Sequence, residues 1–155
     1  MVASGAILTE AQAQPYVFKI VNVRSRKCLD VANGSNKNGG NIQQYEDNGT
    51  LSQQWEVVPL DKRMYKIVCV GNKKCLEVAD GAMEDGANVQ QDEDNGTAAQ
   101  KWYFVHVQGE TFKVVNVRSG KCLDVNDGSF DNGANVQQYQ DNGTFAQQWQ
   151  FIRIQ

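Results

Sequence analysis

Few side chains in this 155-residue sequence have the types and spacing needed for acid–base, redox or metal chemistry. His106 is the single histidine, which is too few for a histidine-rich metal site, and no nucleophile motif accompanies it as a possible base. None of the four cysteines forms a C-x-x-C pair, which excludes a zinc ribbon and a thioredoxin-like redox site. They are Cys28, Cys69, Cys75 and Cys122. An oxygen-rich loop from Asp127 to Asp131 lacks the glutamate that completes an EF-hand, so we expect no metal and no cofactor.

Composition and charge describe an ordinary globular domain without a general affinity for nucleic acid or membranes. Hydrophobic residues make up 41% of the chain, the net charge is −3, and the lysines and arginines form no basic stripe. No apolar run approaches the ~20 residues of a membrane span. Residues 1–14 lack the positive start and uninterrupted apolar stretch of a signal peptide. We therefore expect a terminal arm or linker over 1–14 and one domain over 15–155, either cytoplasmic or a module of a secreted parent protein.

A repeat of 47 residues organises the whole chain. Three of the cysteines recur every 47 residues, and so do the three tryptophans, Trp55, Trp102 and Trp149. Segments 18–61 and 112–155 align without a gap and are identical at 27 of 44 positions, so these two copies have diverged least. The middle copy keeps the frame but differs more in chemistry. This pattern predicts three repeats without insertions, over about 15–61, 62–108 and 109–155.

Each repeat carries the signals of four short strands. Segments such as FKIVNV (18–23) are rich in β-branched and aromatic residues, and a polar turn separates them from a second strand such as CLDV (28–31). A Gly-rich loop and a third strand follow, and a strand that begins at the tryptophan ends the repeat. No segment has the 3.6-residue periodicity of an amphipathic helix. Twelve strands in three equal units predict an all-β barrel with pseudo-threefold symmetry, because closure removes the sheet edges.

A Gln-x-Trp motif near the end of each repeat points to a known family. Its three copies are Gln53-Gln54-Trp55, Gln100-Lys101-Trp102 and Gln147-Gln148-Trp149. Each tryptophan can pack toward a shared axis, while the glutamine can satisfy backbone polar groups at the turn. With Cys-Leu-Asp-Val and Ile/Val-Gln-x-Tyr upstream, the pattern resembles the ricin-type β-trefoil lectins and family 13-like carbohydrate-binding modules over residues 15–155. The resemblance implies a β-trefoil that binds sugar and is not an enzyme.

The resemblance also implies two sugar sites, in the first and third repeats. In that family an aspartate receives two sugar hydroxyls, an aromatic ring stacks on the sugar, a glutamine supports the pocket, and a polar residue bonds the sugar edge. The matching residues are Asp30, Tyr45, Gln43 and Asn48 in the first repeat, and Asp124, Tyr139, Gln137 and Asn142 in the third. The aspartates and tyrosines also have a purely structural interpretation, as solvated strand-end acids and half-buried packing residues.

The residue types at these two sites suit a pyranose that has an axial hydroxyl. Such a sugar packs its C–H face on an aromatic ring and donates its paired hydroxyls to a carboxylate. We therefore expect glycans with galactose or N-acetylgalactosamine, such as galactosides or plant and cell-surface polysaccharides. In the family an asparagine often precedes Gln-x-Trp, but Ser52, Ala99 and Ala146 stand there in this chain, which leaves the exact sugar open.

The middle repeat departs from the family pattern. Glu77 replaces the aspartate and Asp92 replaces the aromatic residue, while Gln90 and Asn95 keep their places. A longer acid without a ring beside it should bind sugar poorly, so we expect this third site to be vestigial.

The cysteines and the Asn-Gly turns admit alternatives. Many family members join the cysteine of Cys-Leu-Asp-Val to a second cysteine near a later turn, but here Asp47, Asp94 and Asp141 take that second position, which implies buried thiols. Cys69 and Cys75 flank a predicted hairpin, and a bridge between them stays open. The Asn-Gly-Thr sequences at 48–50, 95–97 and 142–144 are formal glycosylation sites and also turn signals, and we expect them to be unmodified turns.

Three functions remain open at this point. The first is a lectin, as a monomer or homodimer, or a glycan-targeting module appended to a larger enzyme or toxin. The second is a protein-interaction or inhibitor trefoil whose sugar pockets are relics. The third is a glycoside hydrolase fragment, which would need a carboxylate pair such as Asp30 with Glu46 or Asp47, and nothing in the sequence indicates a raised pKa in either partner.

Overall fold

The computed structural model describes residues 16–155, which form twelve strands, seven short 3₁₀ turns and no α-helix. The arm predicted over 1–14 lies outside the described residues. The strands of the first repeat are β1 (Tyr16–Asn22), β2 (Cys28–Val31), β3 (Ile42–Tyr45) and β4 (Trp55–Pro59). Those of the second are β5 (Tyr65–Cys69), β6 (Cys75–Val78), β7 (Val89–Asp92) and β8 (Trp102–Gln108). Those of the third are β9 (Thr111–Asn116), β10 (Cys122–Val125), β11 (Val136–Tyr139) and β12 (Trp149–Arg153).

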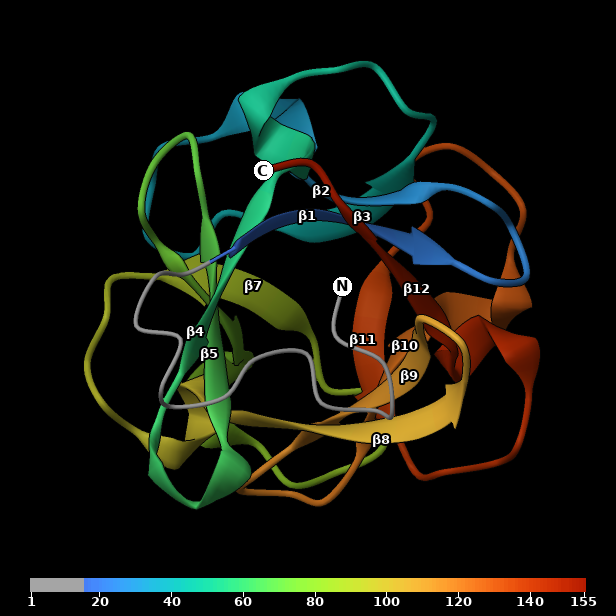
Figure 1. The fold of residues 1–155 in the computed structure, drawn as a ribbon. Helices are drawn as coiled ribbons and strands as arrows, with labels where there is room; N and C mark the ends of the chain where they lie inside the picture. Colours follow the sequence, from blue (N-terminus) through green and yellow to red (C-terminus); the bar gives the residue numbers. More distant parts are fainter. Residues whose placement is uncertain (1–15) are drawn as a thin grey trace.

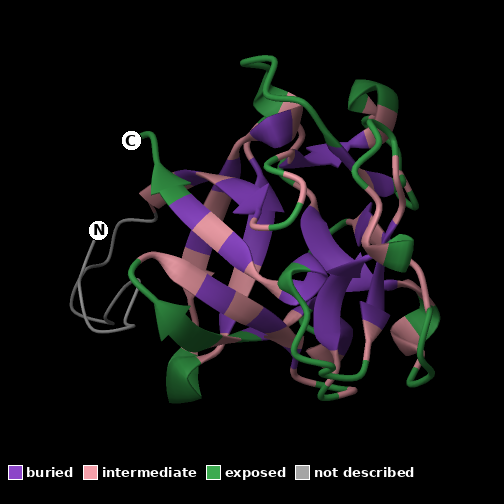
Figure 2. Cartoon of the chain, turned by 90° about the vertical axis from the view of Figure 1, so that its right-hand side faces the viewer, coloured by how far each residue is buried: buried purple, intermediate pink, exposed green. Residues whose placement is uncertain are grey.

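Six strands close into a barrel, two from each repeat. The pairing runs β1–β4–β5–β8–β9–β12 and returns from β12 to β1, and every pair in this ring is antiparallel. Along β9, buried residues alternate with partly exposed ones, so one face of the strand lines the interior. Figure 2 shows this alternation along the barrel strands, with the exposed residues gathered in loops and at strand ends. The predicted all-β, twelve-stranded β-trefoil is confirmed.

The other six strands form three hairpins at one end of the barrel. They are β2–β3, β6–β7 and β10–β11, each joined by a single residue pair to the first strand of its own repeat. In Figure 1, β3, β7 and β11 lie around the middle of the molecule. The amides of Asn41, Asn88 and Asn135 hydrogen-bond to one another in a closed ring, at distances of 2.8–2.9 Å. This ring ties the three hairpins together across the pseudo-threefold axis.

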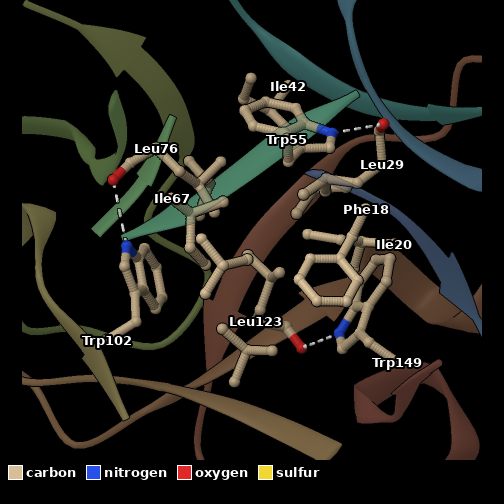
Figure 3. Packing of buried hydrophobic residues seen from close by; sticks show 14 of the residues in the cluster. Phe18, Ile20, Leu29, Ile42, Trp55, Ile67, Leu76, Trp102, Leu123 and Trp149 are labelled. Carbon is tan, nitrogen blue, oxygen red and sulfur yellow. Dashed lines mark hydrogen bonds between the residues drawn. The ribbon is translucent and has the colours of Figure 1, made fainter. Parts of the chain in front are cut away.

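The Gln-x-Trp motifs make the core, in the way that their residue types predict. Trp55, Trp102 and Trp149 are fully buried, and each indole N–H donates to a leucine carbonyl in the second strand of its own repeat at 3.0 Å (Figure 3). Each motif glutamine is also buried and satisfies two backbone groups of the preceding turn. In the third repeat, Gln147 donates to the Gln140 carbonyl and accepts from the Asn142 N–H. The tryptophan thus fills the interior while the glutamine fixes the turn that follows the third strand.

The four cysteines are free and buried, so the bridge left open between Cys69 and Cys75 is absent. Burial raises the pKa of the Cys28, Cys75 and Cys122 thiols to about 11, in keeping with their expected role as small apolar residues. At the positions where the family resemblance implied a second cysteine, each repeat has an ion pair instead. The three pairs are Lys19–Asp47, Lys66–Asp94 and Lys113–Asp141, with N–O distances of 2.6–2.7 Å.

His106 lies exposed on β8, where its ring contacts the Gly109 carbonyl at 3.0 Å and packs against Phe112. Over residues 16–155 no helix is long and apolar enough to span a membrane.

Candidate functional site

The third repeat contains a pocket of about 640 Å³ that brings together four residues named from the sequence. Asp124 is on β10, Gln137 and Tyr139 are on β11, and Asn142 is in the turn that follows. The antiparallel register places Asp124 directly opposite Gln137. Tyr139 is two residues beyond Gln137 and so points to the same face of the hairpin. The pocket walls are therefore a carboxylate, a partly exposed aromatic ring and an amide.

The Asp124 carboxylate is fixed in place by neighbouring amides. Gln137 Nε2 donates to Asp124 Oδ2 at 2.9 Å, and Asp124 is only 5% exposed. Burial raises the pKa of this carboxyl, while hydrogen bonds from Gln137 and Gln147 partly oppose that shift. The site thus holds an oriented hydrogen-bond acceptor at its base, next to the ring of Tyr139.

Asn142 offers the complementary chemistry at the rim. Its Oδ1 accepts the backbone N–H of Thr144 at 3.1 Å and the Thr144 hydroxyl at 2.7 Å. Its Nδ2 makes no hydrogen bond within residues 16–155 and so remains a free donor on the pocket wall. The Asn-Gly-Thr segment is a turn, as expected, and it presents an amide to the pocket.

The first repeat reproduces the arrangement around its own aspartate. Asp30 lies opposite Gln43, whose Nε2 donates to Asp30 Oδ2 at 2.8 Å. Asp30 is 5% exposed, burial raises its pKa, and Tyr45 is 36% exposed at the end of β3. Asn48 adopts the same turn, accepting from Thr50 through Oδ1. The aspartate–glutamine pair and the asparagine turn therefore recur in the two hairpins.

The middle repeat differs in the way its carboxylate is used. Its pocket, of about 340 Å³, is lined by the four residues named there: Glu77, Gln90, Asp92 and Asn95. Both oxygens of the Glu77 carboxylate accept from amides at close range, Oε2 from Gln90 at 2.8 Å and Oε1 from Gln100 at 3.0 Å. Asp92 turns back onto the chain, accepting the Glu93 N–H at 2.8 Å. Both oxygens of the central acid thus have a protein partner, and no aromatic ring lines this pocket.

Two arginines that the sequence analysis did not single out also line these pockets. Arg24, between β1 and β2, lines the third-repeat pocket, and Arg118, between β9 and β10, lines the middle pocket. Arg24 belongs to the first repeat and Arg118 to the third, so each lines a pocket that another repeat mainly builds. The sequence feature that could have pointed to them is their spacing, since Arg24 and Arg118 occupy the same place in the 47-residue repeat and Gly71 occupies it in the middle copy.

Comparison with known proteins decides the family. A model of the ricin-type β-trefoil lectin domain-like family matches residues 7–92 and 98–155. The chain belongs to this family. A search of curated proteins gave no match to this lectin domain. Because this is a family of lectin-like domains, the assignment supports carbohydrate binding in general.

Solved structures agree with the family assignment. The lectin domain is 39% identical to the designed threefold-symmetric protein ThreeFoil, with a TM-score of 0.88, covering 89% of this chain and 99% of that one. It is 37% identical to part of an exo-β-1,3-galactanase from Clostridium thermocellum, with a TM-score of 0.88, covering 90% of this chain but only 30% of the galactanase. A ricin B-like lectin from Macrolepiota procera, solved with lactose, is 20% identical with a TM-score of 0.78, covering 99% of each chain, and shares the fold.

Proposed function

We propose that this lectin domain binds pyranosides of the galactose or N-acetylgalactosamine type at two sites, in the first and third repeats, and does not transform them. The observation that carries the proposal is the third-repeat pocket. There the oriented carboxylate of Asp124, the ring of Tyr139 and the free amide donor of Asn142 line one cavity. A carboxylate accepts the paired hydroxyls of such a sugar while an aromatic ring packs on its C–H face.

The similar proteins support a galactoside as the ligand. The galactanase that contains a 37% identical segment is named for its action on β-1,3-galactan, and the lactose-bound Macrolepiota lectin shares the fold. The matched segment covers only 30% of that enzyme, so a domain of this kind can be one part of a larger protein. It would act as a targeting module that holds a larger protein on a galactose-rich glycan.

The acids near the first site support binding without hydrolysis. A glycosidase uses two carboxyl groups, one of which has a raised pKa so that it can donate a proton. Asp47 is instead held by the Lys19 ammonium, whose hydrogen bond lowers the pKa of the Asp47 carboxyl. Glu46 Oε1 accepts from the Asn132 amide at 3.3 Å. Burial raises the pKa of Asp30, so Asp30 would be the proton donor of such a pair, but the carboxylates of Asp47 and Glu46 are held by Lys19 and Asn132 instead of serving as its nucleophile or base.

Titration with lactose, N-acetylgalactosamine and xylobiose tests the proposal. A monosaccharide has about a dozen heavy atoms, and at ~0.3 kcal/mol per atom its dissociation constant should be about 1 mM. The double variant Asp30→Ala/Asp124→Ala should lose galactoside binding and keep its fold. Glu77→Ala, the equivalent change in the middle repeat, should leave binding intact.

Two results would contradict the proposal. Galactoside affinity retained in a folded double variant would mean that the sugar binds elsewhere. If the protein shows no glycan-array binding that free galactose inhibits, the result would favour the protein-interaction trefoil, whose sugar pockets are relics.

A further inference from the structure

The two complete sugar-binding hairpins differ at one position that a neighbouring repeat supplies. Residues 24, 71 and 118 occupy equivalent places in the 47-residue frame and are arginine, glycine and arginine. Arg24 lines the third-repeat pocket and Arg118 the middle one. By the same symmetry Gly71 stands beside the first-repeat hairpin, where its neighbour Asn72 donates to the Ser35 carbonyl at 3.0 Å. The third site therefore has a cation at its rim that the first site lacks.

Arg24 is held as a binding group rather than consumed by a protein ion pair. Its Nε donates to the Gly128 carbonyl at 2.6 Å, and its guanidinium carbon lies 4.6 Å from the centre of the Phe130 ring. Arg24 is exposed, and within residues 16–155 it has no carboxylate within ion-pair distance. Two contacts thus orient the guanidinium while its terminal N–H groups stay available.

We propose that the third-repeat site selects acidic glycans, with Arg24 pairing with a carboxylate on the bound pyranose or on the sugar next to it. This inference rests on the sugar-binding function proposed above. A planar guanidinium presents parallel N–H donors that match the two oxygens of a carboxylate. Asp124 and Asp127 line the same pocket and would repel an anionic ligand. Arg24 is therefore the residue that makes an acidic sugar acceptable there.

The other two sites provide internal comparisons. The first site has Gly71 in place of the arginine and should bind neutral galactosides without a preference for acids. The middle pocket has Arg118, but it also contains Glu77, Asp80 and Asp92 and no aromatic ring. An acidic sugar there would face three carboxylates and no stacking surface, so the arginine alone should not create a site.

The experiment uses the Asp30→Ala background, so that only the third site reports. Methyl galactoside is compared with methyl galacturonate glycoside, and lactose with 3′- and 6′-sialyllactose, in low salt. These two pairs distinguish a carboxylate on the bound ring from one on the adjoining sugar. We expect at least one acidic ligand to bind about three- to tenfold tighter than its neutral partner, the range of a partly exposed charge-assisted pair.

Variants of the arginine assign that preference. Arg24→Gln should remove or reverse that preference, measured as the ratio of the acidic-ligand affinity to the neutral-ligand affinity in the same variant. Arg118→Gln makes the same change at the middle pocket and should alter neither affinity.

A converse variant protects the test against a local folding defect at Arg24. Gly71→Arg is combined with Leu51→Ala in the Asp124→Ala background, because Leu51 is the residue nearest to a side chain added at position 71, and its truncation makes room for the arginine beyond its Cβ. The middle repeat already has alanine at the place of Leu51, as Ala98 beside Arg118. This variant should give the first site the preference for acidic ligands.

The outcomes separate the two proposals. If the parent binds neither neutral nor acidic sugars, the proposed function itself fails. If neutral galactosides bind but acidic ones bind no tighter, the inference is overturned. It is equally overturned if the acidic preference survives in Arg24→Gln, or if Gly71→Arg with Leu51→Ala creates none.

Discussion

Two substitutions in the middle repeat should restore a third sugar site. The change is Glu77→Asp together with Asp92→Tyr, which gives the middle hairpin the residues of the other two. Glu77 now has both carboxylate oxygens bound at close range, by Gln90 and Gln100. The shorter aspartate should draw the carboxylate back from Gln100, to the arrangement that Asp124 has with Gln137 and Gln147. Asn95 already forms the same turn as in the other sites, with its Oδ1 accepting from Thr97.

The size of the effect follows from the chemistry of one site. A restored site should have a dissociation constant of about 1 mM for a monosaccharide, since about a dozen heavy atoms contribute ~0.3 kcal/mol each. The number of sites should rise from two to three. Asp92→Tyr alone leaves the carboxylate occupied, and Glu77→Asp alone leaves the sugar without a ring to pack on. Aromatic packing contributes about 0.5–1.5 kcal/mol, so Glu77→Asp alone should bind about two- to twelvefold more weakly than the double variant.

Amide chemical shifts under galactose titration give the measurement. In the double variant the backbone signals of Asn95 and Thr97 should move with the same concentration dependence as those of Asn142 and Thr144. In the parent they should not move. A folded double variant whose middle-repeat signals stay fixed at saturation of the other two sites would refute the reasoning. Site competence would then depend on something other than the free carboxylate and the ring.

Two further predictions concern the core and the pH dependence. Trp149→Ala should lower the free energy of unfolding by about 3–5 kcal/mol, because it empties a fully buried position. Trp149→Phe loses mainly the indole hydrogen bond and should lower it less. Chemical denaturation measures both changes. Burial raises the pKa of Asp30 and Asp124, and a protonated carboxyl is a poorer hydrogen-bond acceptor. As the pH is lowered, galactoside binding should therefore begin to weaken at a pH above the ordinary pKa of an exposed aspartate. The aspartates of the three Lys–Asp pairs have a lowered pKa, so the pairs stabilise the fold above about pH 4 and lose this contribution only at lower pH. On acidification, sugar binding measured by titration should therefore be lost before the protein unfolds.

The repeat period made most of the fold predictable. The tryptophan and glutamine of Gln-x-Trp act within one repeat, on the turn and on the second strand that precede them, so their spacing along the chain fixes their partners. The same holds for the pairing of Asp124 with Gln137, which lie opposite each other in a two-stranded hairpin. Contacts of this kind are local in sequence and recur three times, and a motif match therefore transfers them reliably.

Contacts between repeats were not predictable in the same way. Arg24 is 100 residues from Asp124 in the sequence, and only closure of the barrel brings β1 of the first repeat beside the third-repeat hairpin. The period shows that positions 24, 71 and 118 are equivalent, but it does not say which pocket each one faces. The 3.0 Å hydrogen bond from Gln100 to Glu77 was also missed, because the sequence shows the acid and the amide but not the distance between them.

The structure suggests how one symmetric fold can carry unequal sites. The core tryptophans and the asparagine ring are shared by all three repeats, and they hold the hairpins in equivalent positions whatever the rim residues are. The side chains that we propose decide ligand choice, such as Tyr139, Asp92 and Arg24, lie at the pocket rims outside the buried core. A substitution at the rim can therefore silence or retune one pocket without a large loss of stability. The middle pocket and the arginine-bearing third pocket are two results of such changes on one scaffold.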